Sequence, residues 1–277
     1  WMVNMYFVDE EDGLTLIDNG FSGGTNGILQ AAEEAGQPIR RITLTHAHMD
    51  HAGSLDALHE ALPEAELVLP ERTAVFLAGD TSLRPGEPQA PLKGSFVTAD
   101  VVAHRVVTPG EMVGSLRVIA APGHSPDQVA FFDERDGTLI AGDAFQTLGG
   151  FAVSGVMRWR FPLTARATWY LPTAVDTAYS LAALEPKRLA VGHGTVLNNP
   201  GAAIAAGIAE LPTQGLGGEV IGRAKNNAVR GRADHRFQPR EAKVTELEPH
   251  LLCQQHIVRL DVAMDDTHRV SARQRIA

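Results

Sequence analysis

Cysteine and long apolar runs are scarce in this chain of 277 residues. Its one cysteine, Cys253, excludes a disulfide within the chain. No run of about 18 apolar residues occurs, so we predict no transmembrane helix and no membrane partner. Residues 1–12 are typical of a strand that runs into an acidic turn rather than of a signal peptide, so a cytoplasmic protein is expected.

Positive charge is also scarce over most of the chain. Residues 1–221 hold 13 Lys and Arg against 26 Asp and Glu, whereas residues 222–277 hold 11 against 7. An acidic surface repels a polyanion, so we expect a small-molecule substrate and no nucleic acid. The charge changes after the glycine-rich residues 215–218, which are typical of a hinge. We therefore predict a catalytic domain over 1–221 and a basic C-terminal extension over 222–277, for which a homodimer arm is one of several open roles.

Four side chains that bind metals lie within six residues, at His46, His48, Asp50 and His51. Imidazole and carboxylate groups suit Zn²⁺ and similar divalent ions. His46 and His48 are two residues apart, so on an extended backbone they point the same way. Asp50 and His51 follow where the chain is expected to turn into a helix. One short loop can therefore supply ligands to two adjacent ions.

Three further candidates each follow a short apolar run and have glycine beside them, namely His124, Asp143 and His193. The apolar runs are typical of buried strands, so all three side chains are expected at strand ends. Taken alone, each would be an ordinary hydrogen-bonded turn residue. Together with the first motif they give five His and two Asp, which is the complement that a two-metal site needs.

This set of motifs resembles the metallo-β-lactamase superfamily of hydrolases over roughly residues 1–211. The resemblance implies an α+β fold, the four-layer αββα sandwich of two mixed β-sheets flanked by helices. It also implies that His46, His48 and His124 hold one metal, that Asp50, His51 and His193 hold the other, and that Asp143 bridges both. The nearest members by this pattern are lactonases and glyoxalase II-like enzymes. The chain departs from them at Asp127 and Gln128, and it has Gln146 where lactonases often carry Tyr, a role left to Tyr170 or Tyr179.

The predicted function is a dinuclear metal-dependent hydrolase of a small ester, lactone or thioester, in which a metal-bridging hydroxide is the nucleophile. Two Zn²⁺ ions are expected, with Fe and Mn as alternatives. Asp143 and Asp50 are the catalytic candidates, Asp50 as a proton carrier. One alternative is a β-lactam hydrolase, and a second is a persulfide dioxygenase-like oxidoreductase with a single iron. Thr45, Ser125 and Asp18 are expected to orient the ligand imidazoles.

The remaining predictions concern the elements around this centre. We expect residues 79–95 to form a surface loop beside the site and residues 97–107 to be a strand of the second set. Residues 146–172 are irregular in pattern and follow Asp143 directly, so they favour either a substrate-binding cap or a packed connection. Residues 258–264 have the pattern of a strand. The cap would bring Phe151, Met157, Trp159, Trp169 and Tyr170 to the substrate.

Overall fold

The first half of the chain builds one mixed sheet. The computed structural model describes residues 3–211 and 257–260. The strands in spatial order are β14 (Ile257–Leu260), β1 (Met5–Glu10), β2 (Gly13–Ile17), β3 (Ile39–Thr43), β4 (Glu66–Pro70) and β5 (Arg105–Val107). From β2 to β5 the neighbours are parallel, so these strands end at the same edge of the sheet.

The second half of the chain builds a second mixed sheet. Its strands in spatial order are β13 (Leu197–Asn198), β12 (Arg188–Ala190), β9 (Thr138–Ile140), β8 (Val129–Asp133), β7 (Leu116–Ala120) and β6 (Met112–Val113). β9 and β12 are parallel neighbours, whereas β8 runs antiparallel to both β7 and β9. A separate short pair, β10 (Phe145–Gln146) and β11 (Ala152–Val153), follows β9.

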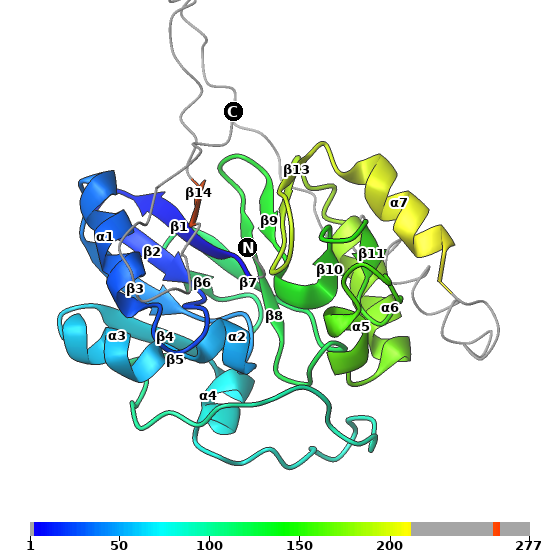
Figure 1. Cartoon of the computed structure of the whole chain (residues 1–277), viewed down its shortest axis with the longest axis horizontal. Coiled ribbons are helices and arrows are strands. Elements are labelled where there is room, and N and C mark those ends of the chain that lie inside the picture. The colour runs from blue at the N-terminus through cyan, green and yellow to red at the C-terminus, as the bar shows by residue number, and fades with distance from the viewer. Residues whose placement is uncertain (1–2, 212–256, 261–277) are drawn as a thin grey trace, which may run out of the picture.

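Helices cover the outer face of each sheet (Figure 1). The first sheet carries α1 (Thr25–Ala35), α2 (Met49–Ala52), α3 (Leu55–Ala61) and α4 (Glu71–Leu77), and the second carries α6 (Leu171–Ala182) and α7 (Gly201–Ala209). The short α5 (Leu163–Ala167) and the 3₁₀ turn η1 (Gly142–Ala144) lie between β9 and α6 in sequence. Three apolar clusters fill the three interfaces of this stack, and the middle cluster lies between the sheets.

Successive side chains of a strand point to opposite faces of the sheet, so one sheet contributes residues to two cores. In β1, Met5 and Phe7 belong to the cluster beneath the helices, while Tyr6 and Val8 belong to the cluster between the sheets. The α+β prediction and the four-layer sandwich are therefore confirmed. The strong inter-sheet core holds the two sheets in a fixed relation, so loops that leave both sheets at one edge are held close together.

The prediction of a long strand over residues 97–107 was wrong. Only Arg105–Val107 is a strand, and it pairs with β4 in the first sheet rather than joining the second set. The preceding backbone N–H groups find partners in loops and helices instead. Val97 donates to Ala47 O, Ala99 donates to Leu77 O, and Asp100 donates to the Asp56 carboxylate. The apolar residues of this segment therefore pack a loop against the first core instead of forming a strand.

The strand predicted over residues 258–264 is observed over Ile257–Leu260, which pairs antiparallel with β1 at the sheet edge (Figure 1). Residues 261–264, the glycine-rich residues 215–218 and the domain boundary at 221/222 lie outside the described residues, so the two-part division stays a prediction. Among the residues that the structure describes, no helix is long and apolar enough to cross a membrane.

Candidate metal centre

The seven predicted ligands meet at one edge of the sandwich, where strands of both sheets end. His46 follows β3, His124 follows β7, Asp143 follows β9 and His193 follows β12. The remaining three, His48, Asp50 and His51, lie at the start of α2, with His48 as its N-cap residue. A backbone hydrogen bond from Val129 N to Thr45 O joins the two sheets at this edge. The two parallel strand pairs, β2 with β3 and β9 with β12, place their carboxyl ends side by side.

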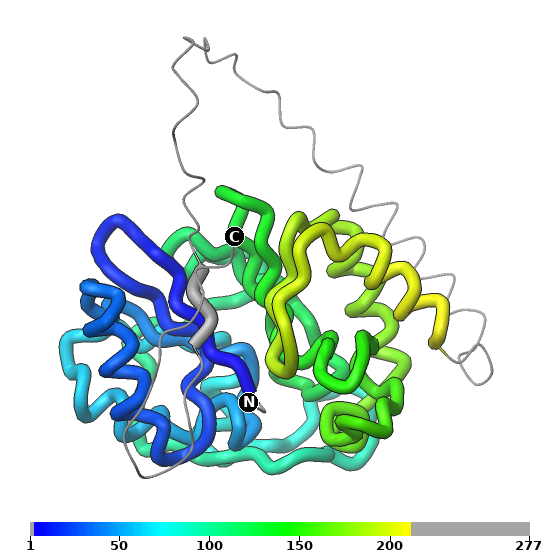
Figure 2. Tube along the Cα trace, turned by 45° about the horizontal axis from the view of Figure 1, so that its top comes forward, coloured from blue at the N-terminus to red at the C-terminus, as the bar shows by residue number. Residues whose placement is uncertain are grey.

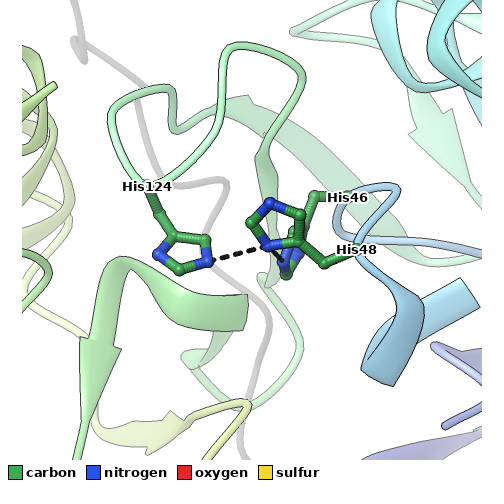
Figure 3. Close-up of side chains that lie close together, drawn as sticks. All are labelled: His46, His48 and His124. Atoms are coloured by element: carbon green, nitrogen blue, oxygen red, sulfur yellow. Dashed lines mark hydrogen bonds between the residues drawn. The ribbon is translucent and has the colours of Figure 1, made fainter. Parts of the chain in front are cut away.

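Three histidines form the first group, as Figure 3 shows. His46 Nε2 lies 3.1 Å from His48 Nδ1, and His48 Nδ1 lies 3.0 Å from His124 Nε2. All three rings are buried, although imidazole is a polar group. The three nitrogens lie within reach of a single central ion.

Each ring in this group has its other nitrogen fixed by an acceptor. His48 Nε2 faces the carbonyl oxygen of Lys93 at 3.1 Å, so that nitrogen carries the proton. His46 Nδ1 faces Thr45 Oγ1 at 3.0 Å, and the Thr45 hydroxyl is itself directed to the Asp18 carboxylate at 2.8 Å. The inward nitrogens of both rings therefore present lone pairs.

His124 is oriented by a chain of hydroxyl groups. The Thr168 hydroxyl donates to Thr164 O at 2.7 Å, and the Ser154 hydroxyl lies 3.0 Å from Thr168 Oγ1. The Ser154 oxygen is then free to accept from His124 Nδ1 at 3.2 Å. His124 Nε2 is thereby left as a third lone pair, 3.0 Å from that of His48. Lone pairs this close repel one another unless a cation lies between them.

The second group combines His51 and His193 with two carboxylates. His193 Nε2 lies 3.1 Å from Asp143 Oδ2 and 3.4 Å from Asp50 Oδ2. His51 Nε2 lies 3.4 Å from Asp143 Oδ1, and its Nδ1 lies 2.8 Å from Asp18 Oδ2. Asp143 Oδ2 also lies 3.4 Å from His124 Nε2, so this carboxylate touches both groups.

Two buried atoms in the second group lack a hydrogen-bond partner, His51 Nε2 and Asp143 Oδ1. Buried polar atoms are nearly always paired, and His51 Nδ1 already faces the Asp18 carboxylate, so His51 Nε2 and Asp143 Oδ1 are two acceptors at 3.4 Å that suit a cation as their common partner. Gly192 adjoins the same two residues, and a Cβ there would overlap Asp143 Oδ1. The residues present thus fit divalent cations, with lone pairs in the first group and charge in the second.

The electrostatic environment of the two groups differs. Burial lowers the pKa of His46 well below its usual range and lowers that of His124 to about 3, so both are neutral. Burial also opposes the charge on His193, but the Asp143 carboxylate outweighs it and raises the pKa to about 10. Burial raises the pKa of Asp50, yet His51 and His193 bring it to about 2. In the second group, a carboxylate thus raises the pKa of an imidazole and imidazoles lower that of a carboxylate, so this group carries charge of both signs whereas the first is neutral.

The sequence pattern of a known family covers all seven candidate metal ligands. A model of the metallo-β-lactamase superfamily matches residues 1–193. The chain belongs to this superfamily. It is 49% identical over 199 residues to the uncharacterized protein YobT of Bacillus subtilis (strain 168), covering 72% of this chain and 85% of YobT.

Two further relatives of this metallo-β-lactamase-superfamily chain agree with that match. The probable metallo-hydrolase YflN of Bacillus subtilis (strain 168) is 27% identical over 214 residues, covering 70% of this chain and 81% of YflN. The crystal structure of TTHA1623 in a di-iron-bound form superposes with a TM-score of 0.53 at 25% identity, covering 72% of this chain and 91% of that one.

The loop after α4 lies against the metal centre, as expected for residues 79–95. It supplies the Lys93 carbonyl to His48, and the Phe96 ring lies 4.5 Å from the His48 ring. Figure 2 shows this segment, in teal, running along one edge of the molecule from the first half to the second. Trp169 Nε1 donates to Ala90 O at 3.0 Å, which joins the loop to the segment that follows Asp143. Two loops of this superfamily member thus meet beside the site.

The five predicted substrate residues are dispersed. Phe151 stacks on Phe145 and adjoins α7, so it belongs to the second core. Trp169 is buried, and the backbone N–H groups of Trp169 and Tyr170 donate to the carbonyls of His124 and Gly123. Met157 and Trp159 are exposed, Trp159 by 84%. Residues 146–172 are therefore partly a packed connection and partly an exposed surface.

The departures from the family pattern have structural roles here. Asp127 Oδ2 accepts a hydrogen bond from Ala47 N at 2.8 Å and so supports the first motif. Gln146 is buried, and its amide donates to Leu148 O and Phe161 O. Tyr179 lies away from the site, in a cavity of about 490 Å³ between α6 and α7.

Some neighbours of the metal centre were not predicted. Ser154 and Thr168 contact His124 where Ser125 was expected, and the Phe161 ring, which belongs to the segment considered as a cap, lies 5.0 Å from that of His193. Asp18 and Thr45 do contact ligand rings, as expected. Local sequence carries no signal for the missed residues, because 30 or more residues separate Ser154 and Thr168 from His124.

Proposed function

We propose that the protein is a dinuclear metal-dependent hydrolase of a small-molecule ester, lactone or thioester. The observation that carries the proposal is the position of Asp143. One of its oxygens lies 3.4 Å from His51 Nε2, and the other lies 3.4 Å from His124 Nε2 and 3.1 Å from His193 Nε2. A carboxylate that faces both groups is suited to bridge two ions. A relative at 25% identity, TTHA1623, has been crystallised in a di-iron-bound form.

The roles of the residues follow from their environment. His46, His48 and His124 would hold one ion, Asp50, His51 and His193 the other, and Asp143 both. Ions held in this way supply a nucleophile by lowering the pKa of water, and they polarise the bond under attack. Zn²⁺ suits this ligand set, and iron or manganese would suit it as well.

Asp50 is the proton carrier in this proposal. Its side chain is 24% exposed, whereas those of His51 and Asp143 are buried, so it faces the side from which a substrate enters. Its Oδ2 lies near His193 and His51. In this proposal its other oxygen carries the proton that the leaving group receives. The carboxylate would take this proton from the attacking water and pass it to the leaving group.

The test is acid release by zinc-loaded protein over lactones, thioesters, aryl esters, β-lactams and phosphodiesters. Wild-type protein and Asp143→Ala are compared, and metal content is measured on both samples. We expect a dominant rate on one acyl class, about two ions per chain, and loss of one ion with at least a 100-fold loss of rate in the variant, because the bridge is removed. A single iron with oxygen uptake and no hydrolysis would overturn the proposal.

A further inference from the structure

Asn4, the residue before β1, is buried and has hydrogen-bond partners in the other half of the chain. Its side-chain amide nitrogen donates to Val191 O and to Gly194 O, both at 2.7 Å. Its backbone N–H donates to Gly192 O, also at 2.7 Å. These three carbonyls belong to the residues around His193, although 190 positions separate Asn4 from Gly194 in the sequence. The start of the first sheet therefore holds the turn that carries a candidate metal ligand.

The strand order explains why Asn4 reaches this turn. β1 is antiparallel to β2, with Tyr6 opposite Ile17, so the start of β1 lies beside the end of β2, at the edge where the ligands meet. β12 of the second sheet ends at the same edge, and residues 191–194 leave it there. The Tyr6 side chain, which lies between the sheets, adds a hydrogen bond from its hydroxyl to Val191 O at 2.7 Å. The contact is thus a bridge between the two sheets.

Every carbonyl of residues 191–194 has a donor. The His193 carbonyl accepts from the backbone N–H groups of Thr147 and Leu148, at 2.9 and 3.2 Å. Asn4 supplies donors to the other three. Buried carbonyls need such partners, so these hydrogen bonds fix the backbone from which the His193 ring projects.

Each group of metal ligands is divided between the two halves of the chain, and each has its own bridge between the sheets. Beside the first group, Val129 N donates to Thr45 O at 2.9 Å. Beside the second group, the bridge is made by Asn4 and acts on the turn of His193. His193 Nε2 lies 3.4 Å from Asp50 Oδ2, which comes from the other half, and both must reach the same ion. A displacement of about 1 Å is enough to spoil such a site.

We propose that Asn4 is a positioning residue for the second ion, because its amide holds the His193 turn at the spacing that the ligands of the first half require. This inference rests on the proposed function, since it concerns the same dinuclear centre. Asparagine suits the role because its NH₂ group has two donors and serves two carbonyls at once. Loss of this amide should therefore weaken the binding of the second ion and spare the first, whose bridge is separate.

The experiment measures zinc binding to the full-length protein rather than turnover. Chelator competition gives the two stepwise affinities, and zinc-edge anomalous diffraction from crystals at limiting zinc shows which position each ion fills. In Asn4→Ala we expect the ion beside His193 to bind about tenfold or more weakly, and the affinity of the ion beside His46 to change by less than about twofold. Asn4→Ser keeps one donor, so we expect an intermediate and equally selective loss. This variant decides the question if Asn4→Ala does not fold.

Gln37→Ala is the matched control, because it also removes a side-chain amide hydrogen bond of the first half. Gln37 Nε2 donates to Asp9 Oδ1 at 2.9 Å, and Gln37 precedes β3, at the end of that strand opposite the metal ligands. We expect wild-type affinity for both ions in this variant. An equal weakening of both ions in the Asn4 variants, in step with a lower Tm, would overturn the inference, because Asn4 would then act on the fold as a whole. Unchanged binding of both ions would overturn it as well.

Metal binding and turnover separate this inference from the proposed function. If the wild type binds two ions but hydrolyses none of the substrates, the proposed function fails, and the zinc affinities of the Asn4 variants still decide the inference. If the wild type binds a single ion, the inference is overturned whatever the turnover, because there is no second ion for Asn4 to position.

Discussion

The carboxylate of Asp18 lies 2.8 Å from His51 Nδ1, although 33 residues separate the two in sequence. Asp18 comes at the end of β2, with a left-handed φ of 59°, and its oxygens also receive the N–H and hydroxyl of Thr45. Through Thr45 it reaches His46 as well. One buried carboxylate therefore orients a histidine in each of the two groups.

The variant Asp18→Asn should weaken metal binding. The amide removes the negative charge that holds the His51 proton on Nδ1, and it disturbs the Thr45 hydroxyl. Loss of such a partner typically costs about 10–100-fold in metal affinity. Zinc affinity is measured by chelator competition, with Asp12→Asn as the control, because Asp12 pairs with Arg41 on the exposed surface. Equal affinities in the two variants would contradict this role of Asp18.

In the variant Gly192→Ala, the Asp143 carboxylate should no longer reach the position from which it would bridge two ions. A Cβ there overlaps Asp143 Oδ1 and lies 2.8 Å from His51 Cε1, so the carboxylate must turn away. We expect about one ion per chain instead of two and at least a 100-fold lower rate. Gly201→Ala at the start of α7 is the control, since no atom lies within 4 Å of its Cβ. Full metal content in Gly192→Ala would contradict this prediction, because it would show that the site tolerates a Cβ beside Asp143.

The variant Trp169→Phe should loosen the loop after α4. It keeps most of the buried ring but removes the hydrogen bond to Ala90 O, which contributes about 0.5–1.5 kcal/mol. Limited proteolysis should then cut residues 79–95 several times faster, and KM should rise more than kcat falls. Trp159→Phe changes an exposed ring and serves as the comparison. Identical cleavage rates would mean that other contacts hold the loop.

Removal of metal should lower the thermal stability. A ligand that binds only the folded state stabilises it by about 2.7 kcal/mol at 100 times its Kd, which corresponds to roughly 5–10 °C in Tm for a domain of this size. Calorimetry of chelator-treated protein, before and after zinc is returned, measures the difference. A Tm that does not change with zinc would count against a cation at the buried His51 Nε2 and Asp143 Oδ1.

Deletion of residues 222–277 should leave zinc stoichiometry intact. All seven proposed ligands precede residue 222, and the deleted part contributes β14 at the edge of the first sheet. The deletion exposes β1 as an edge strand, so weaker solubility is expected. Metal analysis of the soluble fraction measures the outcome, and loss of both ions would place the domain boundary elsewhere.

The sequence by itself identified the seven side chains that come together. Metal ligands are chemically distinctive, and His46, His48, Asp50 and His51 are adjacent in the chain, so their grouping needs no knowledge of packing. Strand ends could be located around His124, Asp143 and His193 because apolar runs and glycine mark them locally. The sandwich followed from the resemblance that these residues carry.

Only the tertiary structure decided which residues orient and surround that set. Residues 97–104 have a strand-like pattern, yet their N–H groups bond to Ala47, Leu77 and Asp56 rather than to a neighbouring strand. Phe151 looked like a substrate contact and packs in the core, while Ser154 contacts the His124 ring without any local signal. Ligand identity is a property of a side chain, whereas its hydrogen-bond partner depends on which distant segments the cores bring to the same edge.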